Sequence, residues 1–155
     1  TGYCSGYCAG QPLTRKEPAM RDIHPALAAA QASWRCVQTD DKEGWLDLMA
    51  DDICIEDPIG VAPTNPTGEG VRGKLEVGKF YDSFIGPATI RVETHQSHAA
   101  GNESAHVLTL NTTLPNGVVT RVTGIFTYRL NDAGKLCSLR GYWTMADRVI
   151  HEPAD

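Results

Sequence analysis

The chain has 155 residues, of which 41% are hydrophobic and 21% charged, and its formal net charge is −5. This length suits one domain with a real core, and the mildly acidic balance argues against nucleic acid or an anionic membrane as the main partner. No apolar run approaches the roughly 18 residues that a transmembrane helix needs. We therefore expect one globular domain with no nucleic-acid or membrane partner.

Residues 1–22 mix Gly, Pro and charged residues without apolar periodicity, and they predict a flexible N-terminal tail. They lack the charged start and apolar stretch of a secretory signal. Cys4 and Cys8 lie in this tail, where a local disulfide or metal clip is an alternative to free thiols. The remaining cysteines lie in apolar patterns typical of small buried residues: Cys36, Cys54 and Cys137. A reducing, cytoplasmic location is the default expectation.

The next part of the chain contains apolar residues at helical spacing. They predict three helices, over about 25–37, 45–49 and 74–85. Pro25 is favourable at a first helical position, so the first helix should begin there. Between the second and third helices, a short strand runs through Ile53 and Ile55. It is followed by a loop over 59–72 that is long enough to form a lid or the rim of a pocket.

From Pro87 onward the apolar pattern changes to period two, which is typical of half-buried strands. Four strands are expected, near 90–93, 105–114, 118–130 and 136–145. Pro115-Asn116-Gly117 and the segment 131–134 are turn signals between them. The layout predicts an α+β domain over residues 23–150, in which three helices pack on one face of a curved, mostly antiparallel sheet.

Asp57 stands where the short strand must end. Pro58 disfavours the helical region for the residue before it, so Asp57 should be extended, at the edge of the cavity that the strand lines. Asp-Pro is also common in turns, and a purely structural role is the alternative. The question is whether the chain builds an apolar pocket over Asp57 and supplies a hydrogen-bond donor beside it.

Two other patterns are weaker indications of a functional site. Residues 68–74 match both a dinucleotide fingerprint and a P-loop, but no strand precedes them and Leu75 stands where a P-loop has Ser or Thr. A loop leading into a helix is the better interpretation. His95 and His98 suggest a metal, yet residues three apart on a strand point to opposite faces, and no third ligand is suitably spaced.

Three segments together resemble the ketosteroid isomerase family of the nuclear transport factor 2 and SnoaL-like superfamily. They are Ala50 to Gly60, Gly73 to Asp82, and Tyr128 to Trp143, within a resemblance over about residues 26–146. The resemblance implies a cone-shaped fold, a homodimer and a small, apolar, steroid-like substrate. It also implies an isomerisation that uses no metal or organic cofactor.

The resemblance also implies roles for individual residues. Asp57 matches the family's general base, which moves a proton between two carbons of a ketosteroid and works in an apolar pocket. Tyr81 matches a tyrosine that supports the oxyanion hole. Trp143 matches an aromatic residue that lines the steroid pocket in some members.

Two positions differ from the family. Ser33, with Trp34 beside it, stands where the principal oxyanion tyrosine lies, and Phe126 stands where the protonated aspartate lies. One consequence is that Tyr81 donates directly to the oxyanion, with help from Ser33. Another is that a strand tyrosine replaces the lost donors, and alternation favours Tyr128 over Tyr142 as the inward one.

Two further functions remain open at this stage. The second hypothesis is a protein that binds steroid or polyketide-like ligands without turnover, because both of the family's donors are missing. A cyclase or epoxide hydrolase of the same superfamily is the third hypothesis. The hydrolase needs an Asp/Arg/Asp cluster, for which the candidate arginines are Arg121, Arg129 and Arg140.

Overall fold

The computed structural model describes residues 23–154. The predicted tail over residues 1–22, with Cys4 and Cys8, lies outside the described residues. The helical segments are α1 (Pro25–Gln38), α2 (Lys42–Asp47), α3 (Lys74–Phe80), the π-helical turn η1 (Tyr81–Ile85) and the 3-10 turn η2 (Met145–Asp147). The strands are β1 (Met49–Glu56), β2 (Val71–Arg72), β3 (Thr89–Ala100), β4 (Glu103–Thr113), β5 (Val119–Leu130), β6 (Leu136–Tyr142) and β7 (Val149–His151).

Helix α1 begins at Pro25, as the sequence predicts. The side chain of His24 caps it by accepting a hydrogen bond from the backbone N–H of Ala26 at 3.1 Å, and Pro25 occupies the first turn, where its missing N–H costs nothing. Residues four and three apart then form the buried face of the helix: Ala26, Ala30, Ser33 and Trp34. This face turns both Ser33 and Trp34 toward the sheet.

The sheet has seven strands in the order β2-β1-β6-β5-β4-β3, and β7 pairs with β5. The predicted meander is therefore the larger part of a bigger sheet. Strand β1 joins it by pairing in parallel with β6, whereas the other pairs are antiparallel. The sequence did not predict the parallel pair, because it joins segments about eighty residues apart with no local signal.

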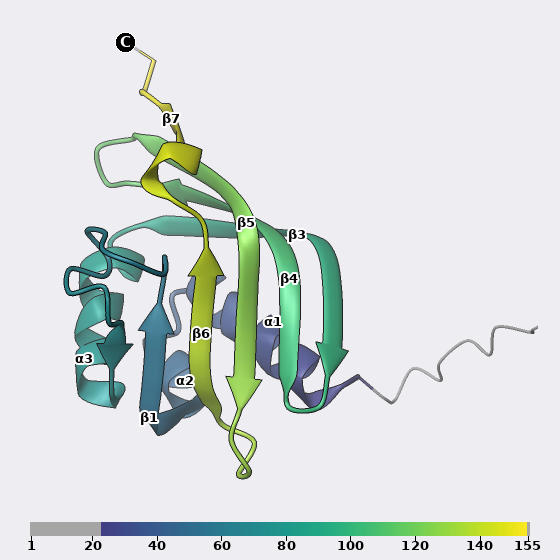
Figure 1. Ribbon diagram of the computed structural model, residues 1–155. Coiled ribbons are helices and arrows are strands. Elements are labelled where there is room, and N and C mark those ends of the chain that lie inside the picture. Colours follow the sequence, from purple (N-terminus) through teal and green to yellow (C-terminus); the bar gives the residue numbers. More distant parts are fainter. Residues whose placement is uncertain (1–22, 155) are drawn as a thin grey trace, which may run out of the picture.

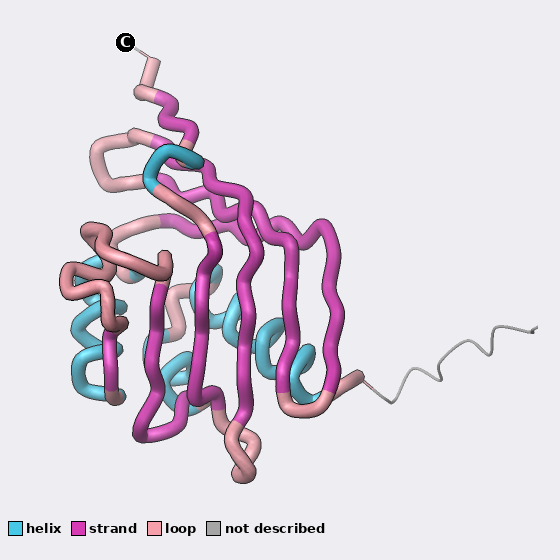
Figure 2. Tube along the Cα trace, in the orientation of Figure 1, coloured by secondary structure: helices cyan, strands magenta, loops and turns pink. Residues whose placement is uncertain are grey.

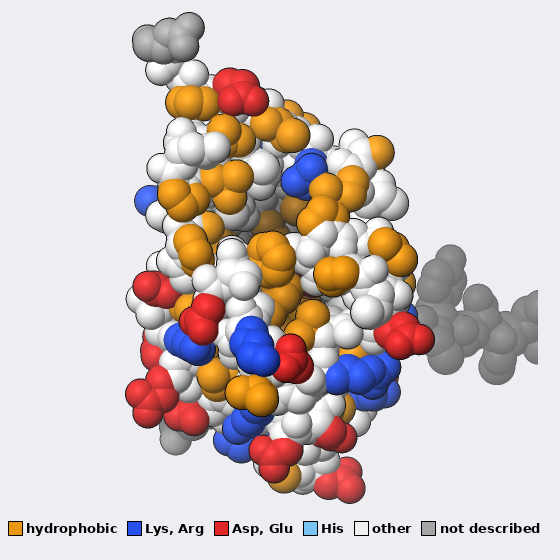
Figure 3. Space-filling view, turned by 90° about the vertical axis from the view of Figure 1, so that its left-hand side faces the viewer, with side chains coloured by type: hydrophobic (Ala, Val, Ile, Leu, Met, Phe, Trp, Pro, Cys, Tyr) orange, Lys and Arg blue, Asp and Glu red, His pale blue; other side chains and the backbone are white. Residues whose placement is uncertain are grey.

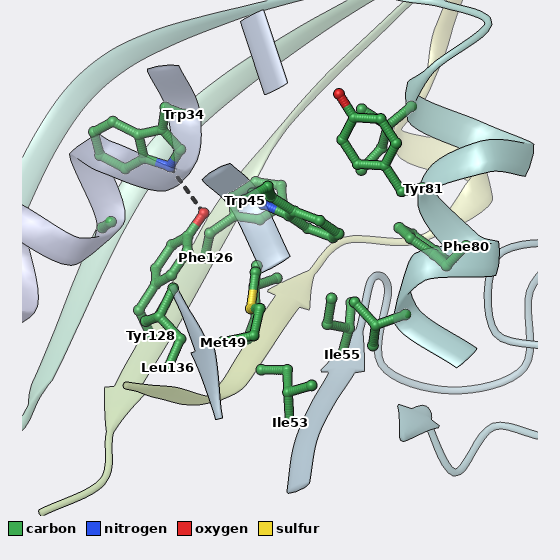
Figure 4. Close-up of a cluster of buried hydrophobic side chains, with 14 of the residues drawn as sticks. Trp34, Trp45, Met49, Ile53, Ile55, Phe80, Tyr81, Phe126, Tyr128 and Leu136 are labelled. Atoms are coloured by element: carbon green, nitrogen blue, oxygen red, sulfur yellow. Dashed lines mark hydrogen bonds between the residues drawn. The ribbon is translucent and has the colours of Figure 1, made fainter. Parts of the chain in front are cut away.

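The helices lie on one face of the curved sheet (Figures 1 and 2). Helix α1 packs against β3, β4 and β5, while α3 packs against β1. The hydrophobic core lies between these layers, and Figure 4 shows its central side chains around Trp45 and Met49. No helix among residues 23–154 is both long enough and apolar enough to cross a bilayer.

The chain end departs from the prediction of a strand over 136–145. Strand β6 ends at Tyr142, and Thr144 then caps the short turn η2. Thr144 and Asp147 satisfy each other's backbone N–H groups in a capping box, which stops the extended conformation. The chain then returns as β7 along β5, near the end of β5 that contains Thr120.

Candidate active site

A cavity of about 300 Å³ lies between the helices and the inner face of the sheet. Its wall is predominantly apolar, with contributions from Ile55, Phe80, Phe126 and Leu139. Figure 3 shows a hollow lined with hydrophobic side chains on the side of the molecule where α3 lies. Concave, mostly apolar pockets with few polar groups are typical of small-molecule sites.

Asp57 lines this cavity, immediately after the last residue of β1. The backbone around it is held from two sides. The N–H of Ile59 donates to the carbonyl of Gly141 at 3.0 Å, and the Thr64 hydroxyl donates to the carbonyl of Asp57. The buried Asn65 closes the following loop by donating to the carbonyl of Pro58 at 3.0 Å. The strand end and its loop therefore fix the position of this carboxylate.

The environment of Asp57 favours its neutral form. Burial raises the pKa of Asp57 from 3.8 to about 6, against a smaller lowering effect of the hydrogen bond from Trp143. That bond joins the indole Nε1 of Trp143 to Oδ1 of Asp57 at 2.7 Å. No other Asp or Glu of residues 23–154 lines the cavity. A carboxylate with a pKa near neutrality, set in an apolar wall, has the properties of a general base.

Gly141 makes room for this pair. A Cβ atom at Gly141 would lie 2.6 Å from Oδ1 of Asp57 and 2.9 Å from Nε1 of Trp143. Both distances are far below van der Waals contact, so any side chain here would displace the carboxylate or the indole. Gly141 thus serves the site through the space it leaves open, rather than through an unusual backbone angle.

The chain has three tryptophans, and each donates its indole N–H to a polar group of the cavity wall. Trp143 donates to Asp57, Trp45 to the hydroxyl of Ser33 at 3.0 Å, and Trp34 to the hydroxyl of Tyr128 at 2.8 Å. Figure 4 marks the bond from Trp34 to Tyr128. An indole N–H can only donate, so each hydroxyl acts as the acceptor and keeps its own proton.

The protons of Ser33 and Tyr128 are therefore available to a ligand. Within the described part of the chain, neither hydroxyl donates to a protein acceptor. Both side chains are buried and line the cavity. Burial raises the pKa of Tyr128, and the nearby charge of Asp57 raises it further. Tyr128 is thus a neutral hydrogen-bond donor, and it lies close enough to Asp57 for the charge of the carboxylate to affect its pKa.

His106 packs against Tyr128 and Trp34. Its ring contacts Trp34 edge-on, at 4.8 Å between centroids, and Tyr128 at 5.5 Å. The Ser104 hydroxyl donates to the carbonyl of Ala26, so it accepts from Nε2 of His106, and Nδ1 then accepts from the Ser97 hydroxyl. Burial lowers the pKa of His106 to about 4, and the ring is a neutral packing element.

Tyr81 is placed differently from the other predicted site residues. It does not line the cavity, and its hydroxyl donates to Oδ1 of Asp40 at 2.7 Å. Figure 4 shows this hydroxyl well apart from that of Tyr128. The Tyr81 ring packs on Trp45, at 5.4 Å between centroids, and Trp45 donates to Ser33. Tyr81 thus contacts the cavity wall through Trp45.

The other predicted residues divide between the two faces of the sheet. Six of the seven line the cavity: Asp57, Ser33, Trp34, Phe126, Tyr128 and Trp143. Tyr142 is 49% exposed on the opposite face. None of the three candidate arginines lines the cavity either, and two of them pair elsewhere, Arg121 with Glu93 and Arg140 with Glu56. The polar cluster that a hydrolase needs does not form around Asp57.

Sequence reasoning missed three residues of the site. Trp45 and Gly141 matter through contacts with Ser33 and Asp57, and no local pattern indicates such contacts. Arg148 lines the cavity, but the prediction of a continuous strand through Met145 left it without a position. The spacing of Thr144 and Asp147 is a capping-box signal that would have ended that strand.

Comparison with known proteins agrees with the fold. Residues 30–139 match the SnoaL-like domain family. The structure is similar to a crystal structure of Delta 5-3-ketosteroid isomerase from Mycobacterium sp., with a TM-score of 0.81 and 53% sequence identity, covering 83% of this chain and 100% of that one. The chain therefore belongs to the SnoaL-like domain family and is a ketosteroid-isomerase-like member of the nuclear transport factor 2 superfamily.

Two further similar structures contain or are designed for steroid-type ligands. RV0760c from Mycobacterium tuberculosis, in complex with estradiol-17beta-hemisuccinate, is 46% identical, with a TM-score of 0.78 and coverage of 81% of this chain and 98% of that one. A computationally designed 17-OHP binder is 43% identical, with a TM-score of 0.80 and coverage of 82% and 98%. These matches confirm the predicted cone-shaped α+β fold and the predicted family.

Proposed function

We propose that this protein isomerises a carbonyl-bearing, apolar, steroid-like substrate by moving a proton with Asp57. The observation that carries the proposal is a carboxylate with a raised pKa in an apolar cavity, near a tyrosine hydroxyl whose proton is free. The 53% identity to a ketosteroid isomerase from Mycobacterium sp. supports the same reaction class.

In this reaction the Asp57 carboxylate removes a proton from the carbon next to the carbonyl. The C–H electron pair moves into the ring system, and negative charge develops on the carbonyl oxygen. Asp57 then returns the proton to the γ-carbon, so that the double bond shifts into conjugation. One carboxylate oxygen of Asp57 accepts from Trp143, which leaves the other free for the moving proton.

The charge on the carbonyl oxygen needs donors that are already in place. We assign this role to Tyr128, assisted by Ser33, because both hydroxyls line the cavity with their protons uncommitted. Their acceptor sides are occupied by the indoles of Trp34 and Trp45, which directs the O–H groups elsewhere. Tyr128 and Ser33 would together replace the donors that the family places at the positions of Ser33 and Phe126. Tyr81 would contribute only by packing on Trp45.

The test follows conversion of a β,γ-unsaturated ketosteroid by the absorbance of the conjugated product. Asp57→Asn should lower the rate by about 10²–10⁴-fold, which is the usual contribution of a general base. Glu56 is the neighbouring carboxylate on the other face of the sheet. Glu56→Gln is therefore the matched control, and it should change the rate less than about twofold. Equal rates for wild type and Asp57→Asn would rule out the isomerase.

The rate of the wild-type protein should also depend on pH. Because the base must be ionised, kcat/KM should rise with pH and reach half its maximum near pH 6, the pKa of Asp57. A profile that is flat between pH 4.5 and 8 would contradict the role of Asp57 even if turnover were observed.

A second candidate is a steroid-binding protein without turnover. Phe126 and Ser33, in place of stronger family donors, favour it, as do the ligand of RV0760c and the designed 17-OHP binder. Tight binding of a phenolic steroid, with no conversion of any enone substrate, would support this function over the isomerase. The cyclase or hydrolase is less well supported, because Asp57 is the one carboxylate lining the cavity among residues 23–154.

The proposal also includes a homodimeric assembly and a cytoplasmic location. The family resemblance implies a homodimer, which sedimentation or light scattering of the purified chain would test. The three cysteines of the described residues are unpaired, in keeping with the reducing, cytoplasmic location expected from the sequence: Cys36, Cys54 and Cys137.

A further inference from the structure

Arg148 lines the cavity at the end remote from Tyr128. It lies between η2 and β7, and the next residue, Val149, pairs with Arg121 of β5. Tyr128 lies seven residues after Arg121 in β5, which is about 23 Å along the strand at the usual rise per residue. The curvature of the sheet shortens the direct path, but the guanidinium and the Tyr128 hydroxyl remain at opposite ends of one cavity.

The guanidinium of Arg148 has no partner in the described structure. Its Nε–H is buried without a hydrogen-bond acceptor, and Arg148 forms no ion pair with a carboxylate of residues 23–154. The adjacent Asp147 is committed to capping, since it accepts from the N–H of Thr144 at 2.7 Å and from its hydroxyl at 3.1 Å. Buried donors of folded proteins are nearly always satisfied, so an unpaired one in a cavity wall indicates an acceptor that comes with the ligand.

The neighbouring wall adds polar groups at the same end. Thr112 and Thr120 pair across β4 and β5, and both line the cavity. The cavity therefore has two polar ends joined by an apolar middle. One end holds Ser33, Asp57 and Tyr128, and the other holds Arg148 with the two threonines.

We infer that Arg148 binds a carboxylate carried by the substrate at the end opposite its carbonyl group. The inference rests on the proposed function and specifies its substrate class as an apolar polycyclic ketone with an acidic side chain. A guanidinium is suited to this task, because its fork of donors matches the two oxygens of a carboxylate. The charges also orient the ligand, since the negative charge of Asp57 repels an acid from its own end of the cavity while Arg148 attracts it to the other.

The test compares two ligands that differ only at the carboxyl group, a 3-oxo-4-ene steroid with a C-24 carboxylic acid and the uncharged methyl ester of the same acid. Calorimetric titration of the full chain at pH 7.5 should show about tenfold tighter binding of the acid. In Arg148→Gln this preference should fall to about twofold or less. Arg121→Gln removes the same charge from a residue already paired with Glu93, and it should keep the preference of the wild type.

Several results would overturn the inference. Equal affinities of acid and ester for the wild type would do so, as would a preference for the acid that survives in Arg148→Gln or is lost equally in Arg121→Gln. If neither ligand binds, both this inference and the steroid substrate are wrong. If the acid preference depends on Arg148 while no ketosteroid is converted, the inference stands and the isomerase proposal alone falls.

Discussion

Glu56 and Asp57 are consecutive carboxylates on opposite faces of the same sheet. Glu56 points outward, where Arg140 of the neighbouring strand forms an ion pair with it at 2.5 Å. Asp57 points inward, where its partner is the neutral indole of Trp143 and burial raises its pKa to about 6. The outer carboxylate is partly exposed and pairs with a cation, whereas the inner one is buried and has no ion-pair partner among residues 23–154.

The same contrast separates two tyrosines. Tyr142 of β6 is 49% exposed on the outer face, where the Arg140 guanidinium lies 5.7 Å from its ring centroid. Tyr128 of β5 is buried on the inner face with its proton free. Residue type therefore does not decide which groups can do chemistry here. The face of the sheet decides it, because the face sets solvent, charge partners and access to the cavity.

Among variants that keep Asp57, the largest expected effect comes from removing the inner hydroxyl. Tyr128→Phe should lower kcat on a β,γ-unsaturated ketosteroid by about 10²–10³-fold, the usual cost of losing one oxyanion donor. Tyr142→Phe is the matched control and should change kcat less than twofold. If both variants keep the wild-type rate, Tyr128 is not the donor. Direct donation by Tyr81, the alternative that follows from the two missing family donors, then becomes the next hypothesis to test with Tyr81→Phe.

The sequence could predict that Tyr128 points inward. It could not predict that the Tyr81 hydroxyl is turned away from the cavity. Alternation along a strand is a local rule, and it places Phe126 and Tyr128 on one face. The partner of Tyr81 is Asp40, at a left-handed position (φ 54°) just after α1, and no pattern connects two residues so far apart. The Asp-Pro strand end, the three helices and the wall residue Trp143 were predicted from the sequence and its family resemblance, whereas contacts between distant segments were not.

Crowding the carboxylate should have the next largest effect. Gly141→Ala places a methyl group where Oδ1 of Asp57 and Nε1 of Trp143 now lie, so it should shift the base and lower kcat/KM by about a hundredfold. Gly78→Ala in α3 is the control, because its new Cβ would be 3.7 Å from the nearest atom, in Leu46. Thermal unfolding of both variants will show that they are folded. Wild-type kinetics for Gly141→Ala would mean that the carboxylate need not occupy this position.

The inner carboxylate should also lower stability, in contrast to the outer one. Folding raises the pKa of Asp57 from 3.8 to about 6, so at pH 7 its ionisation opposes folding by at most about 3 kcal/mol. Asp57→Asn keeps an acceptor for Trp143 and should raise the free energy of unfolding at pH 7 by up to that amount. Glu56→Gln loses a partly exposed ion pair and should lower it by no more than about 1 kcal/mol. Urea unfolding of the three proteins measures both values, and a destabilised Asp57→Asn would contradict the desolvation argument.

The smallest expected effect is the pH dependence of the wild type itself, because two buried groups on the inner face oppose each other. As pH falls from 6 to 3.8, folded Asp57 takes up a proton before the unfolded chain does, which adds stability. As pH falls from 6.5 to 4, the unfolded chain protonates His106 while the folded protein, with a pKa of about 4, does not, which removes stability. The two pKa shifts are similar in size, so the contributions of these two groups should nearly cancel between pH 6 and 4. Asp57→Asn removes one side of this balance, and its free energy of unfolding should fall across that range by about 2 kcal/mol more than that of the wild type. All other titrating groups are common to both proteins, so parallel pH dependences would show that the Asp57 carboxyl is not desolvated by the fold.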